Sequence, residues 1–133
     1  MCSSDLRLAL RIAQFHLVDN TRGEPPFWGE SEVVSRQFAM DGDQITGHVE
    51  LKSAAVDRTY SASLRGQLTL TDGKITALKM VANGLFSGEG PYTGGAPKGQ
   101  FPLAISFTLA DGTDFADAVP PQAARGWVDG YIR

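Results

Sequence analysis

Two histidines, His16 and His48, are the side chains of this chain best suited to acid–base chemistry near neutral pH. Asp19 follows His16 by three residues, so on a helix the two side chains would share one face and could hydrogen-bond. Paired with Asp19 or Glu30, His16 would supply the acid and base of a hydrolase or isomerase. Because no nucleophile or oxyanion donor pair accompanies it in the sequence, we expect His16 to be structural and assign no catalytic residue.

The acidic and sulfur-bearing residues do not complete a metal site. Cys2 is the only cysteine, and two separated histidines fall short of the ligands that a structural zinc ion requires. Asp111, Asp114 and Asp117 recur every three residues. That spacing differs from the EF-hand loop, and aspartates in turns or at helix N-caps explain it. We predict no metal and no cofactor.

The glycine-rich stretch 88–99 resembles a nucleotide-binding loop only superficially. Such a loop opens a helix directly after a strand. Here Pro91, Pro97 and Pro102 and a following apolar run argue against a helix. The stretch is therefore predicted to be a structured connector.

Four aromatic residues are candidates for lining a ligand pocket. Phe15 lies on the expected N-terminal helix, Trp28 in the connector after it, Phe38 on a strand and Tyr92 in the glycine-rich stretch. A carrier of a small apolar ligand would place such side chains around a cavity between helix and sheet. The alternative for each of them is burial in an ordinary core.

The composition is that of a folded domain without a nucleic-acid signature. Of the 133 residues, 42% are hydrophobic and 20% are charged, which is unlike a disordered chain. The net charge of −3 and the scattered basic residues argue against nucleic acid as a partner. No apolar run has the length of a membrane span, and a lone cysteine leaves the compartment unassigned.

The segment Leu6–Val18 is predicted to be a helix. Its apolar residues recur at spacings of three and four and form a broad stripe, while Arg7, Arg11 and Gln14 form a narrow polar side. Pro25-Pro26 prevents the helix from continuing. So broad an apolar stripe must be buried against another element.

Five strands are predicted from the alternation of apolar and polar residues. The alternation is clearest in the third strand, where Leu64 and Leu68 are expected to be buried and Arg65 and Gln67 exposed. The expected strands are 32–40, 44–52, 60–70, 75–85 and 101–109.

Asp72-Gly73 is predicted to join the third and fourth strands as a tight turn, because glycine adopts positive φ without strain. The fourth strand is apolar at both odd and even positions, a pattern typical of a strand covered on both faces. Two registers are therefore open. A two-residue turn sets Leu70 opposite Ile75, whereas a three-residue loop with a bulge shifts the pairing by one. We favour the two-residue turn.

Together these elements predict an α+β fold, with an N-terminal helix packed on a curved, mainly antiparallel meander sheet of about five strands. The alternative is a small closed β-barrel, which needs about eight strands to enclose a ligand. Residues 1–6 read as a non-native leader, because Cys-Ser-Ser-Asp-Leu is what a common sequencing adapter encodes after a start codon. Residues 7–133 are then a single domain that could be the C-terminal part of a longer protein.

Three functions follow, none of them from resemblance to a family. The favoured one is a non-enzymatic accessory or interaction domain of bacterial type, with a protein partner. The alternatives are the carrier of a small apolar ligand and the hydrolase or isomerase that uses His16. A carrier requires a sizeable apolar pocket, an enzyme requires a carboxylate within reach of His16, and an interaction domain requires a filled core with an exposed apolar patch.

Overall fold

The computed structural model describes residues 3–23, 25–53 and 57–118, together with residues 120, 121, 123, 124, 127, 129 and 131. The side chains of residues 3–6, 116 and 118 lie outside this description. Of the expected leader, residues 1–6, the backbone from Ser3 onward belongs to the first helix, and the rest lies outside the described residues.

Five antiparallel strands form one sheet in which each strand pairs with its neighbours in the sequence. Short connections between successive strands produce this meander. The first and last strands of the order do not pair with each other within the described ranges, so the sheet is open. The α+β prediction is confirmed, and the alternative of a closed barrel is wrong. The strands are β1 (Val33–Asp41), β2 (Gln44–Lys52), β3 (Thr59–Thr71), β4 (Lys74–Ser87) and β5 (Gln100–Thr108).

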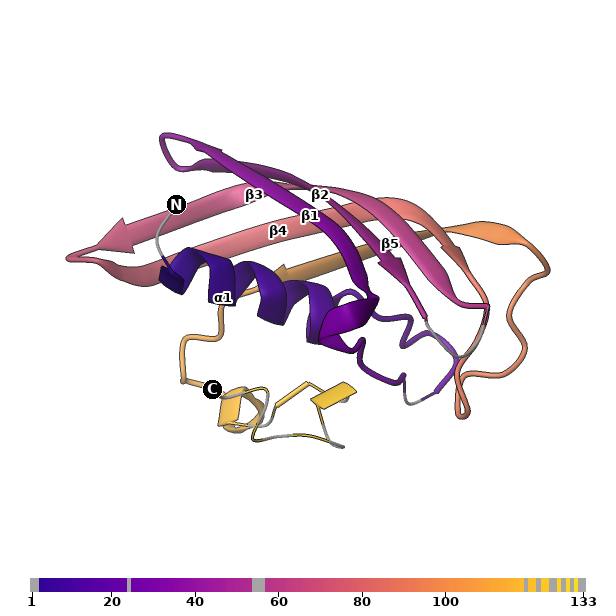
Figure 1. The fold of residues 1–133 in the computed structure, drawn as a ribbon. Coiled ribbons are helices and arrows are strands. Elements are labelled where there is room, and N and C mark those ends of the chain that lie inside the picture. Colours follow the sequence, from indigo (N-terminus) through magenta and orange to yellow (C-terminus); the bar gives the residue numbers. More distant parts are fainter. Residues whose placement is uncertain are drawn as a thin grey trace.

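The N-terminal helix lies across the concave side of the sheet (Figure 1). α1 (Ser3–Arg11) continues into a π-helical turn, η1 (Ile12–His16), in which the Leu17 N–H donates to the Ile12 carbonyl oxygen at 3.2 Å. The helix therefore ends at His16, two residues before the predicted end. Four consecutive residues of η1 are buried: Ile12, Ala13, Gln14 and Phe15.

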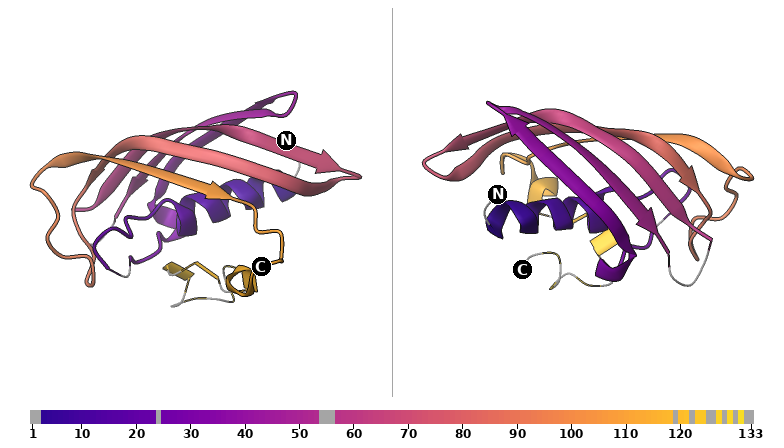
Figure 2. Two further views of the ribbon diagram at one scale, coloured as in Figure 1. Left: turned by 180° about the vertical axis from the view of Figure 1, so that it is seen from behind. Right: turned by 45° about the horizontal axis from the view of Figure 1, so that its top comes forward.

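The chain after β5 forms a further layer beneath the helix. It includes the short 3-10 helix η3 (Phe115–Ala118), and α1 lies between this C-terminal segment and the sheet (Figure 2). Among the helices of the described residues, none is long and apolar enough to cross a membrane.

Gln14 is buried, contrary to the prediction that it belongs to the polar side of the helix. Its side-chain Nε2 donates to the Trp28 carbonyl oxygen, and its backbone carbonyl oxygen accepts from the Trp28 backbone N–H, both at 2.9 Å. A buried amide without partners costs about 1–3 kcal/mol, so its burial depends on this pairing. The connector that carries Trp28 is thereby fixed against η1.

Strand β3 follows its predicted alternation. Leu64 and Leu68 are buried, with 2% and 5% of their surface exposed, while Arg65 and Gln67 are exposed. The two leucines face the concave side because side chains of equal parity share one face of a strand. The expected assignment of the two faces is confirmed.

The β3–β4 hairpin has the favoured two-residue turn, and it also contains a bulge. Asp72 and Gly73 both have positive φ (53° and 78°), as a type I′ turn requires, and Leu70 pairs with Ile75. Thr69 then pairs with Ala77, so Thr76 is an extra residue in β4. Because the inward-facing parity changes at the bulge, Ile75 before it packs on the core, as Leu78 and Met80 do after it.

Beyond the bulge, β4 is covered on one face only. Met80, Ala82 and Phe86 are buried, whereas Val81 and Leu85 on the opposite parity are 48% and 45% exposed. The expectation that this strand is covered on both faces is therefore wrong.

The end of the sheet nearest η1 is filled by aromatic side chains. The rings of Trp28 and Tyr60 lie 6.2 and 5.5 Å from the ring of Phe86, and all three residues are buried. The Tyr60 hydroxyl donates to the Leu103 carbonyl oxygen at 2.8 Å, and the buried Arg58 guanidinium lies 4.0 Å from the centre of the Trp28 ring. We call these five residues the aromatic end.

Both edge strands carry an irregularity. In β1 the register shifts between Val33 and Ser35, which leaves Val34 as the extra residue of a second bulge. In β5 Pro102 pairs with Leu85 but has no N–H to donate.

Candidate functional site

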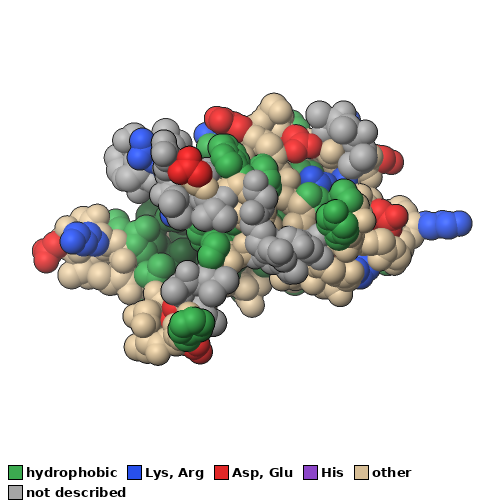
Figure 3. Space-filling model, turned by 90° about the horizontal axis from the view of Figure 1, so that it is seen from below, with side chains coloured by type: hydrophobic (Ala, Val, Ile, Leu, Met, Phe, Trp, Pro, Cys, Tyr) green, Lys and Arg blue, Asp and Glu red, His purple; other side chains and the backbone are tan. Residues whose placement is uncertain are grey.

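A cavity opens between α1 and strands β1 to β3, at the end of the sheet away from the aromatic end. Its volume is about 280 Å³. We call this space cavity A; its described lining residues are all apolar, namely Leu8, Ala9, Ile12, Phe38, Met40, Ile45 and Leu68. The underside of the molecule also shows a hollow beside the tip of the β3–β4 hairpin, where hydrophobic side chains gather (Figure 3).

Small residues on facing elements account for the space and shape of cavity A. Ala9 brings only a methyl group from the helix. On β2, a Cβ at Gly47 would lie 2.8 Å from a ring carbon of Phe38, so the Phe38 ring lies directly on the glycine backbone. Glycine at this position is what allows the ring to line the cavity, because a larger residue would displace it.

A second space, cavity B, lies on the other side of α1, against β4, the end of β5 and the C-terminal segment. Its volume is about 370 Å³, and it shares Leu8 and Ile12 with cavity A. Unlike cavity A, it has charged and polar residues in its wall. The remaining lining residues are Arg11, His16, Leu78, Phe107, Thr108, Leu109, Ala110, Asp117, Pro121 and Tyr131.

His16 lies in the wall of cavity B. Its ring stacks on Phe107 with centroids 5.6 Å apart, and its Nε2 lies 3.3 Å from the Tyr131 hydroxyl oxygen. Burial lowers the pKa of His16 from its usual value of 6.5, and the nearby positive charge of Arg11 lowers it further. The imidazole is therefore neutral at pH 7.

Asp19 bonds to residues other than His16. Its carboxylate accepts hydrogen bonds from the backbone N–H and hydroxyl of Thr21, and it forms an ion pair with Arg22. Burial alone would raise the pKa of Asp19, but these hydrogen bonds and the charge of Arg22 outweigh it and lower the pKa. Glu30 is exposed. Among the hydrogen bonds of the described residues, none joins His16 to either predicted carboxylate.

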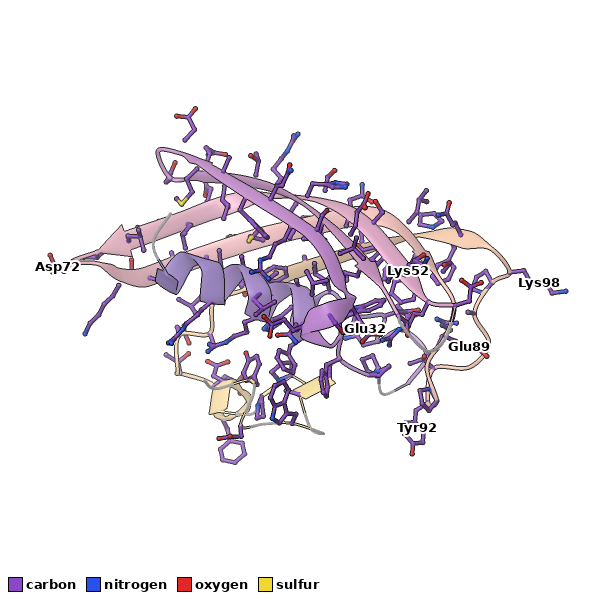
Figure 4. The ribbon with its side chains drawn as sticks, in the orientation of Figure 1. Glu32, Lys52, Asp72, Glu89, Tyr92 and Lys98 are labelled. Atoms are coloured by element: carbon purple, nitrogen blue, oxygen red, sulfur yellow. The ribbon has the colours of Figure 1, made fainter. Side chains whose placement is uncertain are left out.

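Of the four aromatic residues expected to line a pocket, Phe38 lines cavity A. Tyr92 is 74% exposed and points away from the sheet and the helix (Figure 4). These two residues therefore do not share a cavity.

The other two aromatic candidates are buried in ring clusters. Phe15 lies 5.2 Å from Phe27 and 5.4 Å from Tyr131, measured between ring centroids. Trp28 belongs to the aromatic end, where its indole N–H donates to the Leu17 carbonyl oxygen at 2.8 Å. Both side chains are buried, with 1% of their surface exposed.

The aspartates near the C-terminus accept hydrogen bonds from the backbone of their own turns. The Asp111 carboxylate accepts from the N–H and hydroxyl of Thr113, and the Asp117 carboxylate accepts from the N–H groups of Gly112 and Asp114. In the part of the chain that the structure describes, no group of three His, Cys, Asp or Glu side chains could hold a metal ion.

Comparisons of the chain with known protein families, with curated protein sequences and with solved structures found no match. The function must therefore be argued from the geometry of the two cavities.

Proposed function

We propose that the protein binds a small apolar ligand in cavity A and acts as its carrier. The observation that carries this proposal is an open, apolar cavity of about 280 Å³ between helix and sheet. A well-packed interior has few voids larger than a water molecule. Cavity A is such a larger space, and its wholly apolar described lining distinguishes it from cavity B.

The lining of cavity A defines the chemistry of the ligand. An apolar cavity of about 150 Å³ already takes up benzene or xenon, so this one has room for a larger hydrocarbon group. Its described lining side chains offer no hydrogen-bonding group. A polar group of the ligand would lose its hydration there without compensation, so the bound part should be a hydrocarbon or an uncharged aromatic ring system.

Titration with the neutral fluorophore N-phenyl-1-naphthylamine tests this function. Wild-type protein should give a saturable rise in fluorescence with one site per chain. In Ala9→Phe, the larger ring occupies cavity A, and the affinity should fall by at least about tenfold.

The matched control for this experiment is Ala104→Phe. Ala104 is exposed on β5, so the same substitution there leaves cavity A unchanged. The proposal is contradicted if wild-type protein shows no saturable binding, or if both variants lose the same affinity while remaining folded.

A second proposal, an accessory domain that contacts a protein partner, is supported by the apolar surface near cavity A. Met40 is 45% exposed at the cavity, and Leu70 is 52% exposed at the hairpin tip. Leu70→Ser, which lies outside the cavity lining, should remove co-purification of such a partner while leaving fluorophore binding intact. Unchanged co-purification would exclude this surface as the contact.

A further inference from the structure

Cavity B differs from cavity A in having one polar wall. Leu78, Phe107 and Leu109 form apolar surface on the side of the sheet. Arg11 and His16 face the same space from the helix. A ligand that fits both walls must be amphiphilic, with a hydrocarbon part and a polar head.

Arg11 sets the charge of the polar wall. Its guanidinium lies 5.2 Å from the centre of the Tyr131 ring, a cation–π arrangement that holds it beside the cavity. Among the ion pairs of the described residues, none includes Arg11. A half-buried guanidinium in this position is a ready partner for an anion, since it presents several N–H donors in a planar array.

Asp117 is the one carboxylate in the described lining of cavity B. Its Oδ2 accepts from the N–H groups of Gly112 and Asp114, at 3.0 and 3.3 Å. Two backbone donors therefore offset part of its charge, and it is committed to the turn that precedes η3. By contrast, none of the hydrogen bonds among the described residues uses the guanidinium N–H groups of Arg11.

We propose that cavity B is a second binding site, which takes the carboxylate of an amphiphilic acid on Arg11 and its hydrocarbon chain against Leu78, Phe107 and Leu109. The volume of about 370 Å³ is more than twice the roughly 150 Å³ that holds benzene in an engineered apolar cavity, so a medium-length alkyl chain fits. This site does not depend on the function proposed for cavity A, because the two share only Leu8 and Ile12.

A carboxylate suits this wall better than a neutral or a doubly charged head. A neutral head would desolvate the guanidinium without compensating its charge. A carboxylate pairs with guanidinium through two parallel hydrogen bonds. A dianion such as an alkyl phosphate would add repulsion from Asp117, which lines the same space.

His16 makes binding depend on pH. The charged and titratable groups that line cavity B together with His16 are Arg11 from the helix, Asp117 from η3 and Tyr131 from the C-terminal segment. A bound carboxylate adds a negative charge beside the ring and raises the pKa of His16. Binding should therefore tighten as the pH falls toward and below 6.5, the usual pKa of a histidine, and His16→Gln should remove this change.

Calorimetric titration with decanoate and with decanol, which differ only in the head group, tests the site. Wild-type protein should bind decanoate at least about tenfold more tightly than decanol. Arg11→Met should bring the affinity for decanoate down to that for decanol. Arg7→Met, at an exposed position of the same helix, is the matched control and should behave as wild type.

Decanoate labelled with ¹³C at its carboxyl gives an independent readout on the wild-type protein. The carboxyl pKa of bound decanoate should lie below that of free decanoate, because Arg11 favours the charged form. Equal affinity for decanoate and decanol, an equal loss in Arg7→Met, or an unshifted carboxyl pKa would overturn the proposal. So would loss of decanoate binding in Ala9→Phe, since the acid would then occupy cavity A; retained decanoate binding in that variant separates this site from the function proposed for cavity A.

Discussion

The two ends of the space between the sheet and the N-terminal helix are filled in different ways. At the aromatic end, Trp28 and Tyr60 are buried, and their polar atoms donate to backbone carbonyl oxygens. At the other end, aliphatic side chains such as those of Ile45 and Leu68 leave cavity A open. The same helix crosses both ends. The comparison indicates that the aromatic end stabilises the fold, so that packing at the other end can remain incomplete.

The largest expected effect is at the aromatic end. Trp28→Ala should lower the free energy of unfolding by about 3–5 kcal/mol, because it removes a buried ring and its hydrogen bond to Leu17. Denaturant titration measures the loss. Trp127→Ala, at a half-exposed ring, is the matched control and should cost clearly less. Equal losses would remove the distinction between the aromatic end and the rest of the core.

Two leucines on the same face of β3 compare the ends directly. Leu64→Ala should cost about 3–5 kcal/mol and Leu68→Ala about 2–3 kcal/mol, since Leu68 borders a space that already exists. A saturating apolar ligand should recover part of the loss in Leu68→Ala only. Thermal unfolding with and without N-phenyl-1-naphthylamine checks this, and recovery in both variants would contradict it.

Tyr60 makes the free energy of unfolding depend on pH in the alkaline range. Burial raises its pKa from 10.0 to about 12 in the folded protein. Between about pH 10 and about pH 12 the unfolded chain loses the Tyr60 proton while the folded protein keeps it. The free energy of unfolding therefore falls over this range, by up to about 3 kcal/mol, and is unaffected by Tyr60 below pH 10. Tyr60→Phe should flatten the dependence of unfolding free energy on pH in this range. Tyr92→Phe, at an exposed ring, should leave it unchanged.

The smallest effect is expected from enlarging alanines at the two ends. Ala9→Leu extends into cavity A and should change stability by no more than about 1 kcal/mol. Ala62→Leu places the same extra atoms among packed neighbours and should cost about 1–3 kcal/mol. Chemical denaturation of both variants measures the two changes in the free energy of unfolding. A larger cost at Ala9 would show that the helix is as tightly packed there as elsewhere.

The parts of the fold that the sequence predicts are those set by local patterns. The alternation in β3 places Leu64 and Leu68 inside because side chains two residues apart share a face. Asp72-Gly73 predicts the hairpin because few residues other than glycine adopt positive φ. The sequence does not predict the bulge at Thr76, although the inward position of Ile75, at the parity opposite to Leu78, is a consequence of it.

The site depends on contacts between distant parts of the chain, and the sequence predicts it poorly. Gln14 is buried because the backbone of Trp28 returns to it, a partner that helical periodicity does not reveal. His16 and Asp19 would share a helical face, but the π-helical turn ends at His16. Cavity A depends on how the sheet curves over Ala9, and its lining residues read as ordinary core positions.

The irregularities at Val34 and Pro102 have a consequence for aggregation. An open sheet presents two strands whose outer backbone groups can pair with a strand from another molecule. The bulge at Val34 interrupts the regular spacing of these groups along β1, and Pro102 removes a donor from β5. Each edge is thus a poor template for a further strand. Edge-to-edge pairing between copies of the protein is therefore less favourable, even though the sheet does not close.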